Sequence, residues 1–216
     1  MSSVIDICNL ALSNLRAGSI NSLTESSLQA QQCSLKYPVV RDFLLRSHAW
    51  QFAHKIVPLA ELADDVFNWA YVYQYPTDCL RINRLIPDIE EFTQTDSSYR
   101  PRHIEDVYST DLTRQIKYEV ANVDGTKVIL ANEGTLRVDY RARVEDTSLF
   151  DPSFIMAFQW YLAAELAEPI VGGDKSGSLR SSALSIYQEH VGAAEVENVN
   201  EQYAEPVISD FINVRS

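Results

Sequence analysis

The spacing of apolar residues predicts two helices at the start of the chain. Between residues 3 and 16 apolar side chains recur three and four positions apart, and Gly18 follows as a stop signal. We expect a second helix from Thr24 to about His48, with Glu25 favouring its amino end. Pro38 lies inside this segment and should kink or divide the helix.

The last third of the chain shows the same helical pattern. Asp151 is a good N-cap residue, and a proline follows it at the first helical position. Pro169 and the glycine pair at 172–173 should end this third helix. A fourth helix should then begin near Asp174 and continue to about Tyr203.

The middle of the chain is rich in Tyr, Val, Ile and Trp with period-two alternation, which is typical of strands. Asp124-Gly125 joins two such runs and predicts a hairpin turn. With the strand that follows residues 132–134, the pattern predicts an antiparallel meander of three strands. The polar segment between Pro87 and Asp111 predicts a long loop or an irregular strand.

These elements predict an α+β protein. Apolar faces at the two ends of the chain cannot be buried separately, so we expect one helical bundle built from both ends, with an inserted antiparallel β domain and an extended C-terminal arm. The expected segments are 1–62 and 149–203 for the bundle, 63–148 for the β domain and 204–216 for the arm.

Charge and composition narrow the class of function. The net charge of −12 argues against a module that binds nucleic acid by neutralising phosphates. Three well-separated cysteines without zinc-like spacing indicate small buried residues in a reducing compartment. No apolar run reaches the ~18 residues of a membrane span, and the start lacks a signal-peptide pattern, so we expect a soluble, unexported protein.

The sequence singles out no catalytic, cofactor or metal site. The acidic pairs Asp64-Asp65, Glu90-Glu91 and Glu145-Asp146 are candidates for acid and base roles, but solvated loop charges are the simpler explanation. None of the histidines has metal-ligand spacing, and no phosphate-binding or nucleophile motif is present. We therefore expect no cofactor and no metal.

Several stretches together resemble a known family. In order they are "IDICNLALSNLRAGSINSLTE", "CSLKYPVVRDFLLRSHAWQFA", "YVYQYPTDCLRINRL", "YRARVEDTSLFDPSFIMAFQWYLAAELAEPI" and "DFINVRS". The chain resembles the tail tubular protein A family of short-tailed bacteriophages, also called head-to-tail adaptor or gatekeeper proteins. The stretches span nearly the whole chain, and none of them is a catalytic signature.

The resemblance implies a structural protein of the virion tail, assembled in the host cytoplasm. It implies a homo-oligomeric, dodecameric ring that binds the portal protein above, the tail nozzle protein below and tail fibres around the junction. Double-stranded DNA passes through the lumen without specific binding, and a negatively charged lumen would let it slide. No membrane is involved, and large interfaces with exposed apolar strips are expected on the free subunit.

Two segments are candidates for partner contacts. By analogy with the arms of the family, the apolar tail should dock into the portal, through Val207, Ile208, Asp210, Phe211, Ile212, Val214 and Arg215. The polar loop of the β domain should contact the nozzle or fibres, or form a plain surface loop, and its candidate residues are Tyr99, Arg100, Arg102 and His103. The alternative function is a tail-associated glycosidase that degrades the cell wall, which needs two carboxylates facing each other across a cleft.

Overall fold

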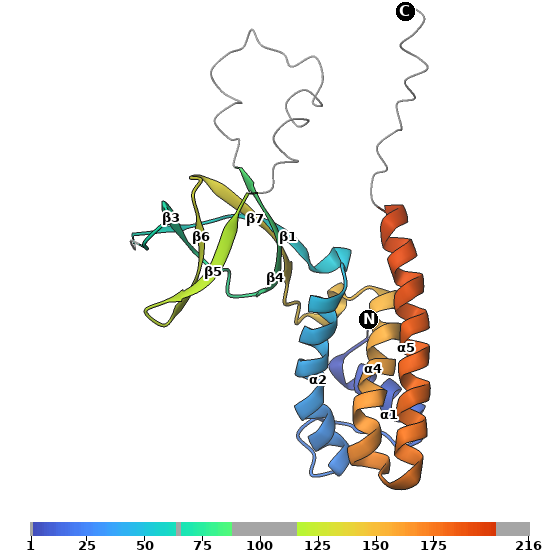
Figure 1. Cartoon of the computed structure of the whole chain (residues 1–216). Helices are drawn as coiled ribbons and strands as arrows, with labels where there is room; N and C mark the ends of the chain where they lie inside the picture. Colours follow the sequence, from blue (N-terminus) through green and yellow to red (C-terminus); the bar gives the residue numbers. More distant parts are fainter. Residues whose placement is uncertain (1, 64–65, 88–115, 202–216) are drawn as a thin grey trace, which may run out of the picture. The chain divides into compact units, whose positions relative to one another are not determined.

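The chain divides into two compact units. The computed structural model describes residues 2–63, 66–87 and 116–201, with side chains described as far as Ala194. The helical unit comprises residues 1–41 and 147–216, and the sheet unit comprises residues 42–146. The described residues form four α-helices and two antiparallel sheets (Figure 1), so the mixed α and β content expected from the sequence is confirmed.

The first helix, α1, spans Val4–Asn14, close to the predicted bounds. Ser3 caps it: its side chain accepts a hydrogen bond from the Asp6 backbone N–H, and the Asp6 carboxylate accepts one from the Ser3 backbone N–H at 2.8 Å. These hydrogen bonds lower the pKa of the Asp6 carboxyl. The buried residues of α1 lie three and four apart, and they are Ile7, Cys8, Ala11 and Leu12.

The second helix, α2, spans Leu28–Ser47, so the predicted start at Thr24 is wrong by one turn. Ser27 provides the cap, because its Oγ accepts a hydrogen bond from the Ala30 backbone N–H at 3.2 Å. Glu25 instead holds the preceding turn, where it accepts from Ser27 Oγ at 2.6 Å. Pro38 does not divide the helix, which continues through it.

Helices α4, Pro152–Val171, and α5, Gly173–Glu201, form a packed pair (Figure 1). Asp151 is the N-cap of α4 as predicted, and it accepts from the Ser153 backbone N–H at 2.7 Å. Of the two expected stop signals, Pro169 does not end the helix, but the glycine pair does: the helix continues to Val171 and ends at Gly172, whose φ of 61° favours glycine. Because α4 also packs against α1, it is buried on several sides.

The described residues of the sheet unit form seven strands in two sheets. They are β1 (His54–Pro58), β2 (Glu61–Leu62), β3 (Tyr71–Gln74), β4 (Cys79–Pro87), β5 (Tyr118–Val123), β6 (Thr126–Ala131) and β7 (Leu136–Ala142). One sheet has the order β1-β7-β4 and the other β2-β3-β6-β5. A single apolar cluster contains Tyr73 and Ile129 of the second sheet and Val138 and Tyr140 of the first, so the two sheets share one core.

The hairpin predicted at Asp124-Gly125 is confirmed, since β5 pairs with β6 across this turn and both turn residues have positive φ. The predicted three-stranded meander is wrong, because β7 does not pair with β6. The second edge of β6 is occupied by β3, and the link after β6 is tied to that strand: Tyr73 Oη donates to the Glu133 carbonyl at 2.8 Å. The chain therefore crosses to the other sheet, where β7 is central.

Strands β1 and β2 were not predicted and lie within the segment 1–62 that the sequence assigned to the bundle. β1 pairs with β7, so it belongs to the sheet unit. The boundaries between the two units follow residues 41 and 146, compared with 62 and 148 expected from the sequence.

Candidate interaction surface

Helix α2 carries apolar side chains on two faces. Its inner face is buried and contains Ala30, Cys33, Tyr37 and Val40. On the outer face Leu28 is 48% exposed, Leu35 62% and Val39 64%. The spacing of seven and four places these three residues, which we call the α2 stripe, on one side of the helix.

Contacts between α2 and α4 hold the inner face in place. The rings of Tyr37 and Phe158 lie 4.8 Å apart between centroids. On the rim of this contact, Lys36 Nζ lies 3.5 Å from a carboxylate oxygen of Glu165, whose other oxygen is 3.3 Å from Arg180 of α5. Since the inner face is committed to the core, the α2 stripe points away from it.

Tyr37 on the inner face of α2 and Cys8 of α1 are both held in their neutral, protonated forms. Burial raises the pKa of the Tyr37 phenol. The neighbouring Cys33 thiol, together with burial, raises the pKa of the Cys8 thiol. All three cysteines are free and buried, as the sequence predicts. These groups therefore behave as core residues.

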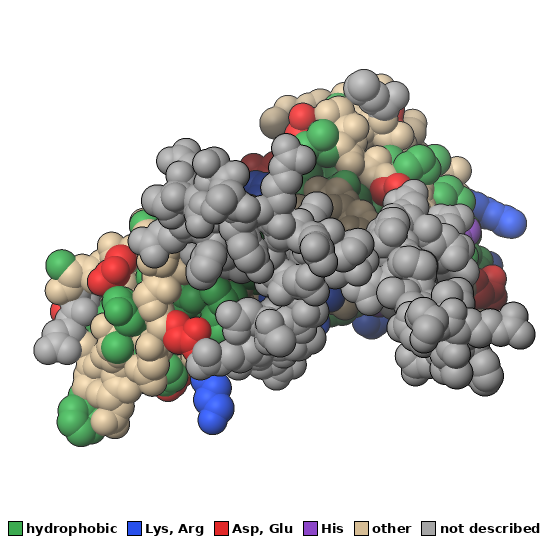
Figure 2. Space-filling model, turned by 90° about the horizontal axis from the view of Figure 1, so that it is seen from above, with side chains coloured by type: hydrophobic (Ala, Val, Ile, Leu, Met, Phe, Trp, Pro, Cys, Tyr) green, Lys and Arg blue, Asp and Glu red, His purple; other side chains and the backbone are tan. Residues whose placement is uncertain are grey.

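Apolar exposure recurs elsewhere in the described part of the helical unit. Leu10 of α1, Met156 of α4 and Leu149 before it are 40%, 41% and 58% exposed. Met156 also lines a shallow surface groove beside His190 and Ala193 of α5. In Figure 2, hydrophobic side chains reach the surface among the described residues. The α2 stripe differs from these single residues because it forms an ordered row on one helix.

The sheet unit contains a charged cluster at Asp139 of β7, which is buried although it carries a carboxylate. Its Oδ1 lies 2.8 Å from His54 Nε2 of β1 and accepts from Asn83 Nδ2 of β4 at 2.8 Å. Its Oδ2 accepts from Arg84 Nε at 3.2 Å. Both oxygens are thus engaged by the two flanking strands, so the cluster ties the three strands together.

The predicted site residues lie outside the described part of the chain. This holds for the arm residues from Val207 to Arg215 and for the loop residues from Tyr99 to His103. Of the acidic pairs, only Glu145-Asp146 is described, and both residues are exposed. The structure therefore leaves the arm and the loop as predictions.

The α2 stripe was not predicted from the sequence, because its residues were assigned to one helix without distinguishing the two faces of that helix. The signal was present: Leu35 and Val39 are four apart, and Tyr37 and Val40 form a second apolar row. Two apolar rows on one helix indicate two contacts, only one of which is inside the described chain.

Comparison with known proteins adds no assignment. No protein-family model matches the chain, and no curated protein matches it significantly. Within the described ranges, no helix is long and apolar enough to cross a bilayer. The described side chains also contain no group of three or more His, Cys, Asp or Glu residues arranged to hold a metal ion.

Proposed function

We propose that the protein is a structural head-to-tail adaptor of a short-tailed phage, which forms a ring between the portal and the tail nozzle and lets DNA pass through its lumen. In this proposal the helices from both ends of the chain form one bundle, the sheet unit is an insertion and residues 204–216 are an arm. The proposal follows the family resemblance of the sequence. The α2 stripe is the structural observation that supports it.

The α2 stripe supports an assembly role because exposed apolar rows are costly unless a partner covers them. Full burial of a leucine or valine side chain contributes about 1.5–3 kcal/mol. Leu28, Leu35 and Val39 are half to two-thirds exposed, so covering them contributes roughly 1–2 kcal/mol each. We assign this surface to the contact between neighbouring subunits, where a modest gain is repeated around the ring.

The distribution of charge supports a lumen lined by the last two helices. In sequence, α4 and α5 carry six glutamates and Asp174, against Lys175 and Arg180. Two of the glutamates have partners within the unit: Glu165 lies 3.3 Å from Arg180, and Glu168 accepts a hydrogen bond from Ser176. The described sheet unit has equal numbers of acidic and basic residues by comparison. An acidic helical surface repels phosphates and would favour sliding of DNA.

The arm is the second interface in this proposal. Val207, Phe211 and Ile212 are apolar residues in a segment too short to bury them by itself, so a groove on the portal would provide the missing contacts. Removing residues 207–216 should abolish portal binding and leave the fold unchanged. A truncated chain that still joins portals would contradict this assignment.

Assembly with the portal protein of the same phage tests the proposal. Native mass spectrometry of the mixture should show a ring-sized complex for the wild-type chain. The double variant Leu35→Lys, Val39→Lys should lose the ring while keeping its circular dichroism and unfolding midpoint, because both positions are exposed.

Ser34→Lys is the matched control. Ser34 is exposed on the same helix but lies about 100° around the helix axis from Leu35, so the added charge should leave assembly unchanged. Failure of the wild-type chain to bind the portal protein would contradict the adaptor function. A double variant that assembles normally would contradict the role of the α2 stripe.

A further inference from the structure

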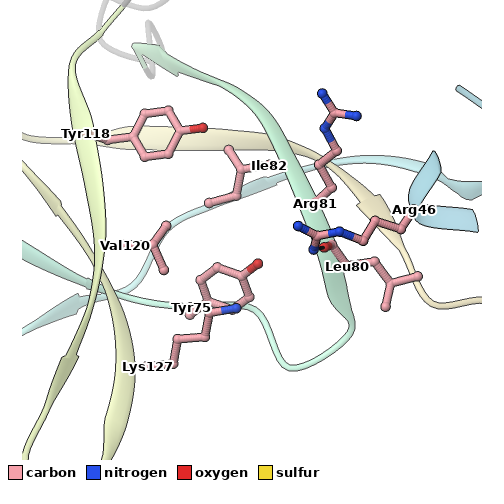
Figure 3. A pocket seen from close by; sticks show the side chains of 8 residues that line it. All are labelled: Arg46, Tyr75, Leu80, Arg81, Ile82, Tyr118, Val120 and Lys127. Atoms are coloured by element: carbon pink, nitrogen blue, oxygen red, sulfur yellow. Dashed lines mark hydrogen bonds between the residues drawn. The ribbon is translucent and has the colours of Figure 1, made fainter. Parts of the chain in front are cut away.

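A pocket in the sheet unit lies outside every site described so far. It has a volume of about 260 Å³ and is lined by Arg46, Tyr75, Leu80, Arg81, Ile82, Tyr118, Val120 and Lys127. Figure 3 shows Tyr118 and Val120 projecting from β5, and Ile82 from β4, toward the space between these two strands. The pocket thus has an apolar and aromatic floor with basic residues around it.

Both strands beside the pocket are edge strands among the described residues. β4 pairs only with β7 in one sheet, and β5 pairs only with β6 in the other. An edge strand presents backbone N–H and C=O groups that can pair with an added strand. The residues on β5 that flank the pocket, Tyr118 and Val120, are two apart and so face the same side.

The β4 side of the pocket has irregular pairing. Its register with β7 shifts between Cys79 and Arg81 and again between Ile82 and Arg84. The carbonyl of Leu80, which lies in the first shift, accepts a hydrogen bond from Arg46 Nη1. This bond fixes the Arg46 guanidinium at the pocket. Bulges of this kind re-aim side chains and are frequent beside binding sites.

The pocket is positively charged. Three of its lining residues, Arg46, Arg81 and Lys127, are basic, and none is acidic. Lys127 Nζ lies 3.6 Å from the centroid of the Tyr75 ring, which positions the ammonium group by a cation–π contact.

The tyrosines contribute no negative charge. Burial raises the pKa of the Tyr118 phenol and that of Tyr75, so both remain neutral at physiological pH. The side chains that line the pocket therefore combine neutral aromatic surface with three cations. A ligand that fits this chemistry carries a carboxylate and an extended, partly apolar backbone.

We propose that the pocket binds an acidic peptide segment of a partner protein, which adds as an extended strand to the edge of β5 that is unpaired among the described residues and places acidic side chains against Arg81 and Lys127. Backbone pairing with β5 supplies part of the affinity, and the three cations supply the preference for acidic side chains. The inference does not depend on the adaptor function, since it concerns only residues of the sheet unit.

A peptide fits the pocket better than nucleic acid does. Binding along a nucleic-acid backbone requires a row of cations that follows the phosphates, whereas these three basic residues surround one small pocket. The described sheet unit has as many acidic as basic residues, and the whole chain carries a net charge of −12. Long-range attraction of a polyanion is therefore absent.

The probe is a fluorescein-labelled, acetylated and amidated heptapeptide in which Glu and Thr alternate, titrated into the full chain and followed by fluorescence polarisation. Its binding should weaken about tenfold with Arg81→Glu and severalfold with Lys127→Met, which keeps the aliphatic stem over Tyr75. Lys117→Glu is the matched control, because Lys117 is exposed and does not line the pocket. It should leave binding unchanged.

Two further peptides separate charge from strand pairing. The Gln-Thr analogue should bind at least tenfold more weakly, and so should a Glu-Thr peptide with alternate backbone nitrogens methylated, because it cannot complete the ladder. The proposal is overturned if the Glu-Thr peptide does not bind, if either analogue binds as well, if oligo-dT binds more tightly, or if Lys117→Glu weakens binding as much as Arg81→Glu.

Discussion

Helix α2 and strand β7 each carry side chains in environments unusual for their type. On α2, Leu35 and Val39 are apolar and about two-thirds exposed, whereas on β7 the charged Asp139 is buried. Asp139 has three donors from β1 and β4 within the same unit. Within the described part of the chain nothing covers the α2 stripe in a comparable way, so it is the one of the two that points to another molecule.

The two faces of α2 test this comparison most strongly, because substitutions on them should differ most in their effect on the free energy of unfolding. Phe158 is fully buried against Tyr37, and Phe158→Ala should lower the free energy of unfolding by about 3–5 kcal/mol because it leaves a cavity beneath the helix. Urea unfolding measures the effect. Leu35→Lys on the opposite face should change it by less than about 0.5 kcal/mol. Equal losses of free energy of unfolding for the two variants would mean that the α2 stripe stabilises the folded chain itself.

The Asp139 cluster should give the next largest effect. Asp139→Ala leaves three donors without their acceptor and should cost about 2–3 kcal/mol in the free energy of unfolding. Asp124→Asn is the control, because Asp124 lies in the hairpin turn at a φ of 48°, which asparagine tolerates. If Asp139→Ala leaves the free energy of unfolding unchanged, the cluster does not hold the three strands together.

A smaller effect than that of the Asp139 cluster is expected at Asp78. Although burial opposes it, hydrogen bonds from Lys55 and Tyr140 lower the pKa of the Asp78 carboxyl. Its stabilising contribution is therefore complete at neutral pH and is lost as the pH falls below about 4. The partly exposed pair contributes less than about 1 kcal/mol.

Lys55→Met removes the charged partner, so the pH profile of urea unfolding between pH 3 and 7 should become flatter. Lys117→Met, which removes an exposed charge elsewhere in the unit, should keep the wild-type profile. An unchanged profile for Lys55→Met would exclude this pair as a source of acid sensitivity.

Helices were predictable from the sequence because their signals are local. The N-cap Asp151 and the stop at Gly18 each lie within a few residues of the helix end that they define. Of the two stop signals expected for α4, Pro169 does not act, since the helix continues two residues beyond it, and Gly172 ends the helix through its backbone conformation.

Strand pairing was less predictable because partners are distant in sequence. Alternation identified β7 as a strand, but it could not show that β1, more than 80 residues earlier, occupies one of its edges. The same alternation places Asp139 on a polar face, and only the side chains of the flanking strands bury its carboxylate there. Likewise, the α2 stripe could not be predicted without knowing which of the two apolar rows of the helix packs into the core.

The most direct test of the central claim is hydroxyl-radical footprinting of Leu35 and Val39 in the purified complex with the portal protein. If the α2 stripe is the contact between subunits, oxidation of both side chains should fall severalfold relative to the free chain, while Phe158 stays protected in both states. Equal oxidation of Leu35 and Val39 in the free chain and in an assembled ring would contradict the account.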